Sequence, residues 1–359
     1  MVSHYNLIAN VLQISALESA SRNSFGIETQ VSLGVLPFSH IYGLTVISLC
    51  GAFRGDQIVV LPKFEFDAFL VATEKYKIEQ LNVVPPILVQ ILASEEKCAK
   101  FDLSSVRLVY SGAAPLAKET VDQLLKKYPK WRVGQGYGMT ECSPGVSTTC
   151  ELDPLMGSCG YLLPGLKAKL VDADGKEVTQ HDTPGELLVQ SPGVTMGYFN
   201  NERATAENYI WDADGRWLKT GDEVVIRKSP SGNEHVVVVD RIKELIKVKG
   251  HQVAPAELEA HILTHGLVSD CAVIAVVDPR AGERPKAYIV KNSKAKGKTD
   301  AEIAAAVCKY VEDHKARHKW IKGGVEFIDI IPKSPSGKIL RRVLRDMHVQ
   351  RQKSDKAKL

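Results

Sequence analysis

The chain has 359 residues, of which 44% are hydrophobic and 25% charged, so it is an ordinary globular sequence long enough for more than one domain. A formal net charge of only +4 argues against nucleic acid as the main partner. No apolar run reaches the roughly 18 residues that a membrane-spanning helix needs.

Strands alternate with amphipathic helices in the first part of the chain. The predicted strands are 56–62, 81–85 and 106–112, and the predicted helices are 66–78, 86–99 and 115–128. This alternation indicates a parallel sheet with helices on its faces. Such sheets bind ligands at the carboxyl ends of their strands, which lead here into "YSGAAP" and "GQGYGMTE".

Two further parts follow, each with its own pattern. From about residue 157, short alternating strands indicate an antiparallel, barrel-like region, in which "SPSGN" reads as a hairpin loop. Beyond residue 241, helices and strands indicate a small α+β domain with a basic tail. Within it, Thr299 and the acidic residues after it predict the start of a helix. We therefore expect an α/β fold in three parts: 1–156, 157–240 and 241–359.

The cysteines and the chain ends give hints about the compartment. The seven cysteines show neither C-x-x-C nor zinc spacing, which indicates structural thiols in a reducing compartment. The lysine-rich stretches 291–298 and 351–359 are expected to be solvated surface. The last residues, Ala357, Lys358 and Leu359, differ by one residue from the Ser-Lys-Leu address. They predict a peroxisomal import receptor as partner and a peroxisomal location; otherwise we expect a cytoplasmic one.

The stretch "PKSPSGK" (332–338) resembles a phosphate-binding P-loop at first sight. The spacing excludes it, because Pro332 occupies the first glycine position and Ile339 replaces the hydroxyl residue. A single lysine on a loop, Lys338, remains, and a solvated basic tail is the alternative.

The stretch "GQGYGMTE" (134–141) combines close backbone approach with polar groups. Its glycines allow a ligand to lie against the backbone, and Tyr137 can stack on a base. Thr140 can contact a phosphate, and Glu141 can hold Mg²⁺ through hard oxygen ligands. Farther on, Asp222 in "KTGD" can accept from both hydroxyls of a ribose. The alternative is a tight strand-to-loop turn.

Several motifs in order resemble one family. They are "PFSHIYGL", "YSGAAPL", "GQGYGMTE", "GELLVQSPGVTMGYFN", "LKTGD", "VDRIKELIKVKGHQVAPAELE" and "PKSPSGKILRR". Over residues 1–345 the chain resembles the adenylate-forming acyl-CoA synthetase (AMP-binding) family, and most of all its 4-coumarate–CoA ligase-like branch. The resemblance implies that a carboxylic acid reacts with ATP to give an acyl-adenylate and pyrophosphate. Coenzyme A then displaces AMP, and the acid is expected to be an aryl or a medium- to long-chain acyl acid.

The resemblance also implies roles for residues of the larger domain. The residues around adenine and phosphate would be Ala113, Gln135, Gly136, Tyr137 and Thr140, with Glu141 on Mg²⁺. The residues lining the acyl pocket would be His40, Tyr42, Gly112, Gly136, Pro144 and Gly145. The ribose would be held by Asp222 and Arg241. A packed core histidine is the alternative for His40.

Residues of the smaller domain would serve the two half-reactions in turn. Lys243 would be the hinge, and Lys247 and Gln252 would face the acyl-adenylate during thioester formation. The coenzyme A contacts would be Lys249, Gly250 and Lys63, unless Lys63 is plain surface. Lys338 would neutralise the charge that develops between two anions during adenylation.

One part of the family pattern is missing from the sequence. The family has a Ser/Thr/Gly-rich phosphate loop just before the segment that resembles "VSHYN", whereas this sequence starts at Met1. Either the sequence is a piece of a longer protein or the short chain is real. A real short chain would lack the backbone cradle for the outer phosphates and is expected to adenylate weakly. The alternatives are a non-catalytic nucleotide- or acyl-adenylate-binding fragment, or an adenylating enzyme that loads a carrier-protein thiol.

Overall fold

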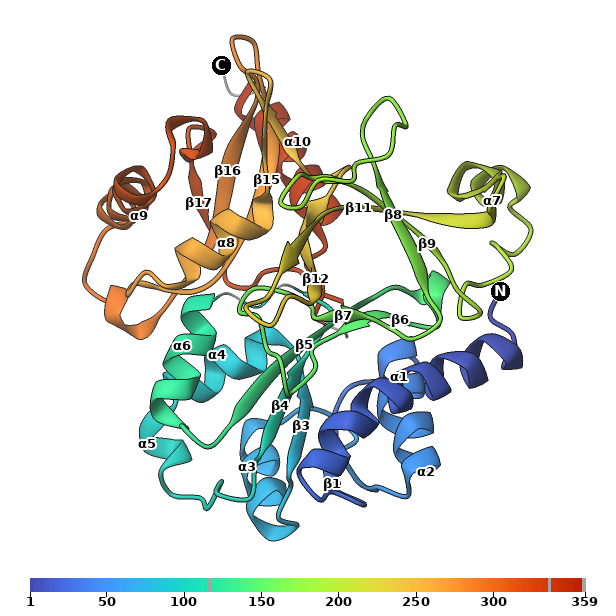
Figure 1. Ribbon diagram of the computed structural model, residues 1–359. Helices are drawn as coiled ribbons and strands as arrows, with labels where there is room; N and C mark the ends of the chain where they lie inside the picture. The colour runs from blue at the N-terminus through green and yellow to red at the C-terminus, as the bar shows by residue number, and fades with distance from the viewer. Residues whose placement is uncertain (115, 117, 335–336, 357–359) are drawn as a thin grey trace. The chain divides into compact units, whose positions relative to one another are not determined.

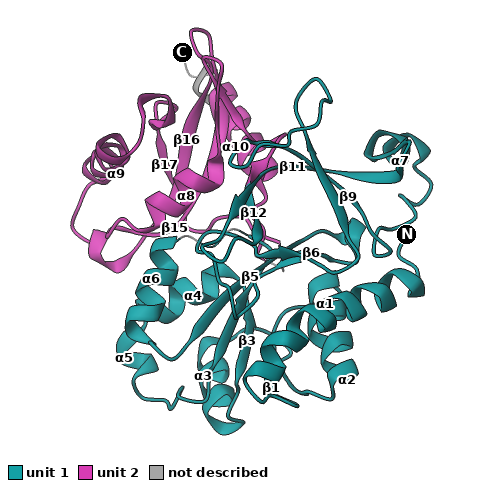
Figure 2. Ribbon diagram, in the orientation of Figure 1, with its two compact units in different colours: residues 1–238 teal, residues 239–359 magenta. Residues whose placement is uncertain are grey.

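The computed structural model describes residues 1–114, 116, 118–334 and 337–356. The chain divides into two units, unit 1 (Met1–Val238) and unit 2 (Val239–Leu359), which Figure 2 shows in different colours. Part of the predicted lysine loop, Pro335 and Ser336, lies outside the described residues. So does the predicted peroxisomal address at 357–359, and the location stays a prediction.

A mostly parallel sheet forms the centre of unit 1, as the sequence predicts. Its strand order is β2-β1-β3-β4-β5-β6-β7, parallel as far as β5 and antiparallel at β6 and β7. The strands are β1 (Val31–Gly34), β2 (Gln57–Val60), β3 (Gln80–Val83), β4 (Leu108–Ser111), β5 (Arg132–Gly138), β6 (Gly145–Thr148) and β7 (Tyr161–Leu162). Each predicted strand of this part is present but shorter.

Helices cover both faces of this sheet (Figure 1). On one face lie α4 (Pro85–Ala93), α5 (Glu95–Cys98) and α6 (Lys118–Lys127), and α3 (Phe66–Lys75) follows β2. The predicted helix 86–99 is two helices, because Ser94 leaves the helical region with φ −111° and ψ 44°. Fully buried side chains such as Phe69, Leu88 and Leu124 form the core. Each contributes roughly 1.5–3 kcal/mol of transfer free energy.

The other face is covered by helices that the sequence reading did not place. They are α1 (His4–Ser24), the π-helix η1 (Tyr42–Leu49) and α2 (Cys50–Arg54). A capping box starts α1: the Ser3 hydroxyl accepts from the backbone N–H of Asn6 at 3.1 Å, and the Asn6 side chain accepts in return. A buried ion pair between Arg22 and Asp56, 2.6 Å long, ties α1 to the loop before β2.

The predicted antiparallel region completes unit 1. Its sheet has the order β10-β11-β9-β8, and β12 pairs with β11. The elements are β8 (Lys167–Val171), β9 (Gly185–Gln190), α7 (Glu202–Asn208), β10 (Tyr209–Asp212), β11 (Gly215–Lys228) and β12 (Glu234–Arg241). The hairpin loop predicted from "SPSGN" is confirmed, because 229–233 joins β11 to β12.

Unit 2 is the predicted small α+β fold. Its sheet has the order β14-β13-β16-β15, and β17 pairs with β16. The strands are β13 (Ile246–Val248), β14 (His251–Val253), β15 (Val268–Asp278), β16 (Gly282–Lys291) and β17 (Val325–Phe327). The helices are α8 (Pro255–Leu263), α9 (Asp300–His314) and α10 (Arg341–Lys356). Thr299 caps α9 in a capping box with Glu302, as its sequence predicts.

The reading of the end of the chain as a plain basic tail was incomplete, because α10 is a helix. Its inner side buries Leu344 in a cluster with Tyr288 and Ile331 of the unit 2 fold. Residues 351–353 are exposed, as predicted. Among the described residues, none of the helices combines the length and hydropathy needed to cross a membrane.

The buried cysteines are structural thiols. Cys50 and Cys142 are fully buried, and burial raises the pKa of the Cys50 thiol to about 12. A thiol with such a pKa is not a nucleophile at neutral pH.

Candidate active site

The two glycine-containing loops of unit 1 lie side by side at one edge of the sheet. Strands β4 and β5 pair in parallel, with Ser111 opposite Gln135 at the carboxyl end. The stretches "YSGAAP" and "GQGYGMTE" therefore leave the sheet at neighbouring points. This is the edge at which open α/β sheets bind their ligands.

Gln135 is fixed at both ends of its side chain. Its Oε1 accepts from the backbone N–H of Leu116 at 3.0 Å, and its Nε2 donates to the carbonyl of Ser158 at 3.5 Å. Next to it, a Cβ on Gly136 would lie 2.4 Å from the hydroxyl oxygen of Tyr110. The Tyr110 side chain occupies the space that a side chain at residue 136 would need, so glycine allows this close packing.

Within unit 1 the half-buried Tyr137 pairs with the buried Asp222. The Tyr137 hydroxyl donates to Oδ2 of Asp222 at 2.6 Å. Burial and then the neighbouring Asp222 carboxylate raise the pKa of Tyr137 well above 10.0, so the phenol stays protonated and donating. The backbone N–H of Asp222 also donates to the Thr220 hydroxyl at 3.1 Å. This geometry places the Asp222 carboxylate, 5% exposed, beside the predicted nucleotide loop, which is the stretch "GQGYGMTE" (134–141).

Glu141 follows the glycines in a short 3₁₀ turn, Thr140–Cys142. Its Oε1 accepts from the hydroxyl of Tyr198 at 2.8 Å, and its carbonyl accepts from the N–H of Thr195 at 2.8 Å. Among the described residues, no group of three or more His, Cys, Asp or Glu side chains can hold a metal ion. A single fixed carboxylate fits Mg²⁺, which is commonly bound by one or two carboxylates together with phosphates.

The predicted acyl-pocket residues of the first loop also come together. The Tyr42 ring lies over Gly112, where an added Cβ would meet it at 3.0 Å. Its hydroxyl donates to the carbonyl of Tyr110 at 3.3 Å. His40 precedes it, and its Nδ1 accepts from the backbone N–H of Tyr42 at 3.2 Å. Gly112 and Tyr42 thus pack directly on each other, and their place in the acyl pocket stays a prediction.

Asn10, which was not predicted from the sequence, holds the backbone at Gly145 in place. Asn10 of α1 is fully buried and clamps the peptide groups of Gly145, the residue after the cis Ser143–Pro144 bond. Its Oδ1 accepts from the Gly145 N–H at 3.0 Å, and its Nδ2 donates to the Gly145 carbonyl at 3.1 Å. An asparagine between apolar helix residues was the available signal.

His235, which was also not predicted from the sequence, supports Gln135 indirectly through Ser158. His235 of β12 is fully buried, with Nδ1 3.0 Å from the Ser158 hydroxyl and Nε2 3.5 Å from Asp153 Oδ2. The Ser158 carbonyl is the acceptor for Gln135, so this network positions the predicted adenine loop. A histidine inside the valine run "EHVVVV" was the signal.

In unit 2, strand pairing places Lys247 opposite Gln252. Both side chains are exposed on β13 and β14, while the flanking pair Ile246 and Val253 is buried. The hairpin turn between these strands consists of Lys249 and Gly250, with φ 49° and 82°. Positive φ at both positions is what a two-residue type I′ turn requires.

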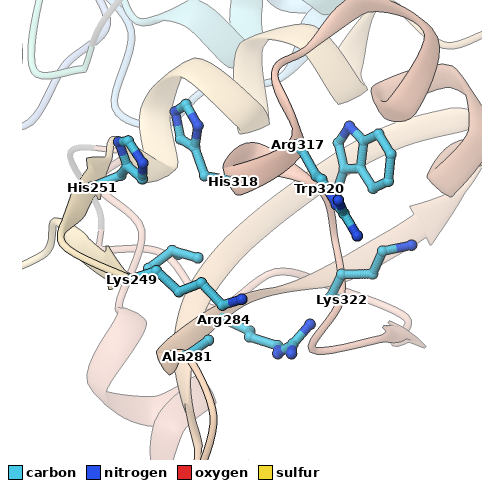
Figure 3. Close-up of a pocket in the computed structure, with 9 residues that line it drawn as sticks. Lys249, His251, Ala281, Arg284, Arg317, His318, Trp320 and Lys322 are labelled. Atoms are coloured by element: carbon cyan, nitrogen blue, oxygen red, sulfur yellow. The ribbon is translucent and has the colours of Figure 1, made fainter.

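A basic hollow of about 490 Å³ opens beside this turn (Figure 3). Cationic side chains surround it, namely Lys249, Arg284, Arg317 and Lys322. Trp320 and the stacked rings of His251 and His318, with centroids 4.4 Å apart, supply flat surfaces. Burial, then His251 and Lys319, lower the pKa of His318, which favours its neutral, stacking form. The sequence reading predicted only Lys249 here, because the others are spread over three segments.

Lys338 lies at the end of a hairpin-like loop, and its side chain is exposed. Lys333 pairs with Ile339, and the N–H of Leu340 donates to the carbonyl of Pro332 at 2.8 Å. The loop base is then anchored by Arg341, whose guanidinium makes bonds of 2.6 and 2.8 Å to the buried Glu259 carboxylate. This geometry confirms that the stretch is no P-loop, since no helix begins at Lys338.

Comparison with known proteins decides the family. The profile of the AMP-binding enzyme matches residues 1–199, and that of the AMP-binding enzyme C-terminal domain matches residues 257–338. The chain belongs to the AMP-binding enzyme family.

Its relatives place it among the acyl-CoA ligases of this family. It is 46% identical to the acyl-CoA ligase lcsD of Purpureocillium lilacinum over 99% of this chain and 92% of that one. It is 41% identical to 4-coumarate–CoA ligase 1 of Arabidopsis thaliana, over 96% of this chain and 60% of the relative. The ATP-bound structure of MatB from Rhodopseudomonas palustris matches 97% of this chain and 65% of its own, with TM-score 0.79 and 29% identity. The chain thus spans about three-fifths of the plant relative and nearly all of lcsD.

Three predicted residues of this AMP-binding enzyme are exposed. Arg241 ends β12, and Lys243 lies in the turn that follows, close to the boundary between the units. The Lys63 side chain is 74% exposed and pairs with Glu65 at 2.6 Å. Their predicted roles at the ribose, the hinge and coenzyme A stay predictions.

Proposed function

We propose that the chain catalyses ATP-dependent ligation of a carboxylic acid to coenzyme A. In the first step a carboxylate oxygen attacks the α-phosphorus of ATP, and pyrophosphate leaves with the electron pair of the broken P–O bond. In the second step the thiol sulfur of coenzyme A attacks the acyl carbon, AMP leaves, and the thiol proton is released. The products are the thioester, AMP and pyrophosphate.

The observation that carries this proposal is the Tyr137–Asp222 pair, in which the Tyr137 hydroxyl donates to the buried Asp222 carboxylate. A fixed, buried carboxylate is suited to accept from ribose hydroxyls. The half-buried Tyr137 ring gives a flat surface for a purine. Together they support an adenine nucleotide at this edge.

Mg²⁺ is proposed to bind at Glu141, whose carboxylate the Tyr198 hydroxyl orients at 2.8 Å. When bound, the ion would supply charge neutralisation at the phosphate oxygens. Tyr198 would keep the Glu141 carboxylate aimed without being a ligand itself. Glu141→Gln should weaken ATP binding in the presence of Mg²⁺ but leave AMP binding without metal unchanged.

Coenzyme A is proposed to place its phosphorylated adenosine in the basic hollow of unit 2. The cations Lys249, Arg317 and Lys322 match its phosphates, and the rings of Trp320 and His318 offer stacking surfaces for its base. Lys249→Met and Arg317→Met should each raise KM for coenzyme A about tenfold, the loss of one charge-assisted contact. Arg280→Met, an exposed neighbour that does not line the hollow, is the matched control.

The acid is proposed to be an aryl or a medium- to long-chain acyl acid. Gly112 lets the Tyr42 ring pack close to the strand end, which supports an aromatic residue as part of the acyl pocket. The likeness to a 4-coumarate–CoA ligase supports an aryl acid first. A panel of cinnamates, phenylacetates and fatty acids, ranked by kcat/KM, tests this order.

The decisive experiment separates the half-reactions. The chain is first given a synthetic acyl-adenylate and coenzyme A, which needs no contact to the outer phosphates of ATP. Thioester should form. ATP–pyrophosphate exchange is then measured as the readout of the adenylation step. AMP binding without thioester formation would replace the proposal with a nucleotide-binding role, and a carrier-protein thiol accepted in place of coenzyme A would change the acceptor.

A further inference from the structure

A second hollow lies in unit 1 at the opposite edge of the sheet. Its walls come from segments that precede β4 and β5, within residues 95–106 and 127–131. The nucleotide loops follow the carboxyl ends of these same strands. The four residues of β4 alone separate the two edges by about 13 Å, at roughly 3.3 Å per residue. The hollow is therefore not part of the active site.

Most of the wall is apolar. The cavity has a volume of about 540 Å³, and its apolar lining is formed by Cys98, Phe101, Leu103, Val106 and Trp131. The ring of Tyr128 stacks on Trp131, with centroids 4.0 Å apart and planes 8° apart. This volume falls within the roughly 300–1,000 Å³ of small-molecule sites.

Two buried donors in this lining lack a strong acceptor within the described part of the chain. They are Nζ of Lys127 and the hydroxyl of Tyr128, which has only the weakly accepting Cys98 sulfur beside it. The Glu95 carboxylate approaches the ammonium to 3.5 Å, but that side chain is 75% exposed and lies at the rim. Burial, then the Cys98 thiol, raise the pKa of Tyr128, so its hydroxyl keeps its proton at neutral pH.

Buried donors without acceptors are rare, because their desolvation is not compensated. Here a cation and a hydroxyl donor occur together at one end of an apolar hollow. Their complement is an anionic acceptor attached to an apolar body. Two donors suit the two oxygens of a carboxylate better than a phosphate, which would leave more oxygens unmatched.

We propose that this hollow is an accessory site that binds an amphipathic carboxylate, with the carboxylate on Lys127 and Tyr128 and the hydrocarbon against Phe101, Leu103 and Trp131. The site is independent of the proposed function, since it shares no residue with the nucleotide loops. Glu95 at the rim is the group that the ligand carboxylate displaces from Lys127.

The test is calorimetric titration of the whole chain with decanoate. Saturable binding with Kd below about 1 mM is expected. Lys127→Met, which keeps the apolar stem, should weaken binding about tenfold, and Tyr128→Phe should weaken it by a smaller factor. The neutral analogue 1-decanol should bind at least about tenfold more weakly than decanoate.

Two controls locate the binding. Lys126→Met removes the neighbouring lysine of α6, which is exposed and does not line the hollow, and should bind decanoate like the wild type. Gly112→Leu combined with Tyr42→Ala reshapes the predicted acyl pocket and should leave this binding unchanged. Wild-type melting temperatures for all variants show that folding is retained.

Three outcomes would overturn the proposal. The absence of saturable binding would mean that the hollow holds water only. Binding lost in the paired Gly112→Leu and Tyr42→Ala variant and kept in Lys127→Met would place decanoate in the acyl pocket. Equal weakening by Lys126→Met and Lys127→Met would show a general charge effect.

Discussion

The nucleotide loop of unit 1 and the lysine loop of unit 2 are held in different ways. In the first, the functional side chains are themselves fixed: Gln135 at both ends, Tyr137 by Asp222, and Glu141 by Tyr198. In the second, the base is anchored by Arg341 on Glu259, and the Lys338 residue is exposed. The first loop resembles a preorganised receptor, and the second presents one exposed cation. Preorganised groups need no reorganisation during a reaction, whereas an exposed cation contributes only when it is brought to the reacting atoms.

The largest expected effect comes from removing that cation. Lys338→Ala should lower the adenylation rate by about 10²–10³-fold, the typical loss of one transition-state donor. Thioester formation from a supplied acyl-adenylate should change far less. ATP–pyrophosphate exchange and single-turnover thioester assays measure the two steps, with the exposed Arg342→Ala as control. Equal loss in both steps would contradict the assigned role.

The next effect tests the fixed loop. Asp222→Asn keeps the shape but removes the charge, and should weaken AMP binding about tenfold or more. Tyr137→Phe removes one donor from Asp222 and should weaken it less. Calorimetry with AMP measures both. If the Tyr137→Phe variant binds AMP more weakly than the Asp222→Asn variant, the Tyr137 hydroxyl rather than the Asp222 carboxylate dominates the site.

A smaller effect is expected behind the loop. His235→Leu leaves the Ser158 hydroxyl without its imidazole partner and should cost about 1–3 kcal/mol of unfolding free energy. AMP affinity should also fall severalfold, because the Ser158 carbonyl positions Gln135. His181→Gln, which changes an exposed histidine paired with Glu234 of β12, is the control. A loss of stability with wild-type AMP affinity would limit His235 to a structural role.

The smallest effect concerns the helix that follows the lysine loop. Nδ1 of His348 on α10 accepts from Nζ of Lys286 at 3.0 Å. Burial and then Lys286 lower the pKa of His348 from 6.5, although Glu326 opposes this. The unfolded chain therefore binds the proton more tightly. The contribution of His348 to stability is present above pH 6.5 and is lost as the pH falls from there toward the folded pKa.

This pH dependence is measured by urea unfolding between pH 6.5 and about 5. His348→Gln should make the free energy of unfolding fall less steeply with pH, and amide exchange should locate the change in α10. His4→Gln, an exposed histidine of unit 1, is the control. An unchanged slope in His348→Gln would show that the Lys286 contact adds nothing.

The sequence predicted what depends on local pattern. The alternation of strands and helices predicted the parallel sheet. Thr299 predicted the start of α9, and "SPSGN" predicted the hairpin between β11 and β12. Contacts between distant segments were not predictable. Asn10 and Gly145 are 135 residues apart, and nothing local marks their pairing. The basic hollow was missed for the same reason, because Arg284, Arg317 and Lys322 meet Lys249 only after folding.

The helix α10 was missed for a different reason. Its composition is strongly polar, so it reads as a solvated tail. Its few apolar residues are sufficient because Leu344 meets Tyr288 and Ile331, and Arg341 meets a buried carboxylate. Tertiary contacts, rather than helix propensity, explain this element.

The glycines of unit 1 set different limits on how this chain can diverge or be redesigned. A side chain at Gly138 would meet the carbonyl oxygen of Pro144 at 2.2 Å, so the backbone itself forbids it. At Gly112 the obstacle is only the Tyr42 ring, at 3.0 Å. A paired change, a larger residue at 112 with a smaller one at 42, can therefore reshape the predicted acyl pocket without altering the nucleotide loop. Acid specificity can thus diverge at this pair of positions while the chemistry stays constant.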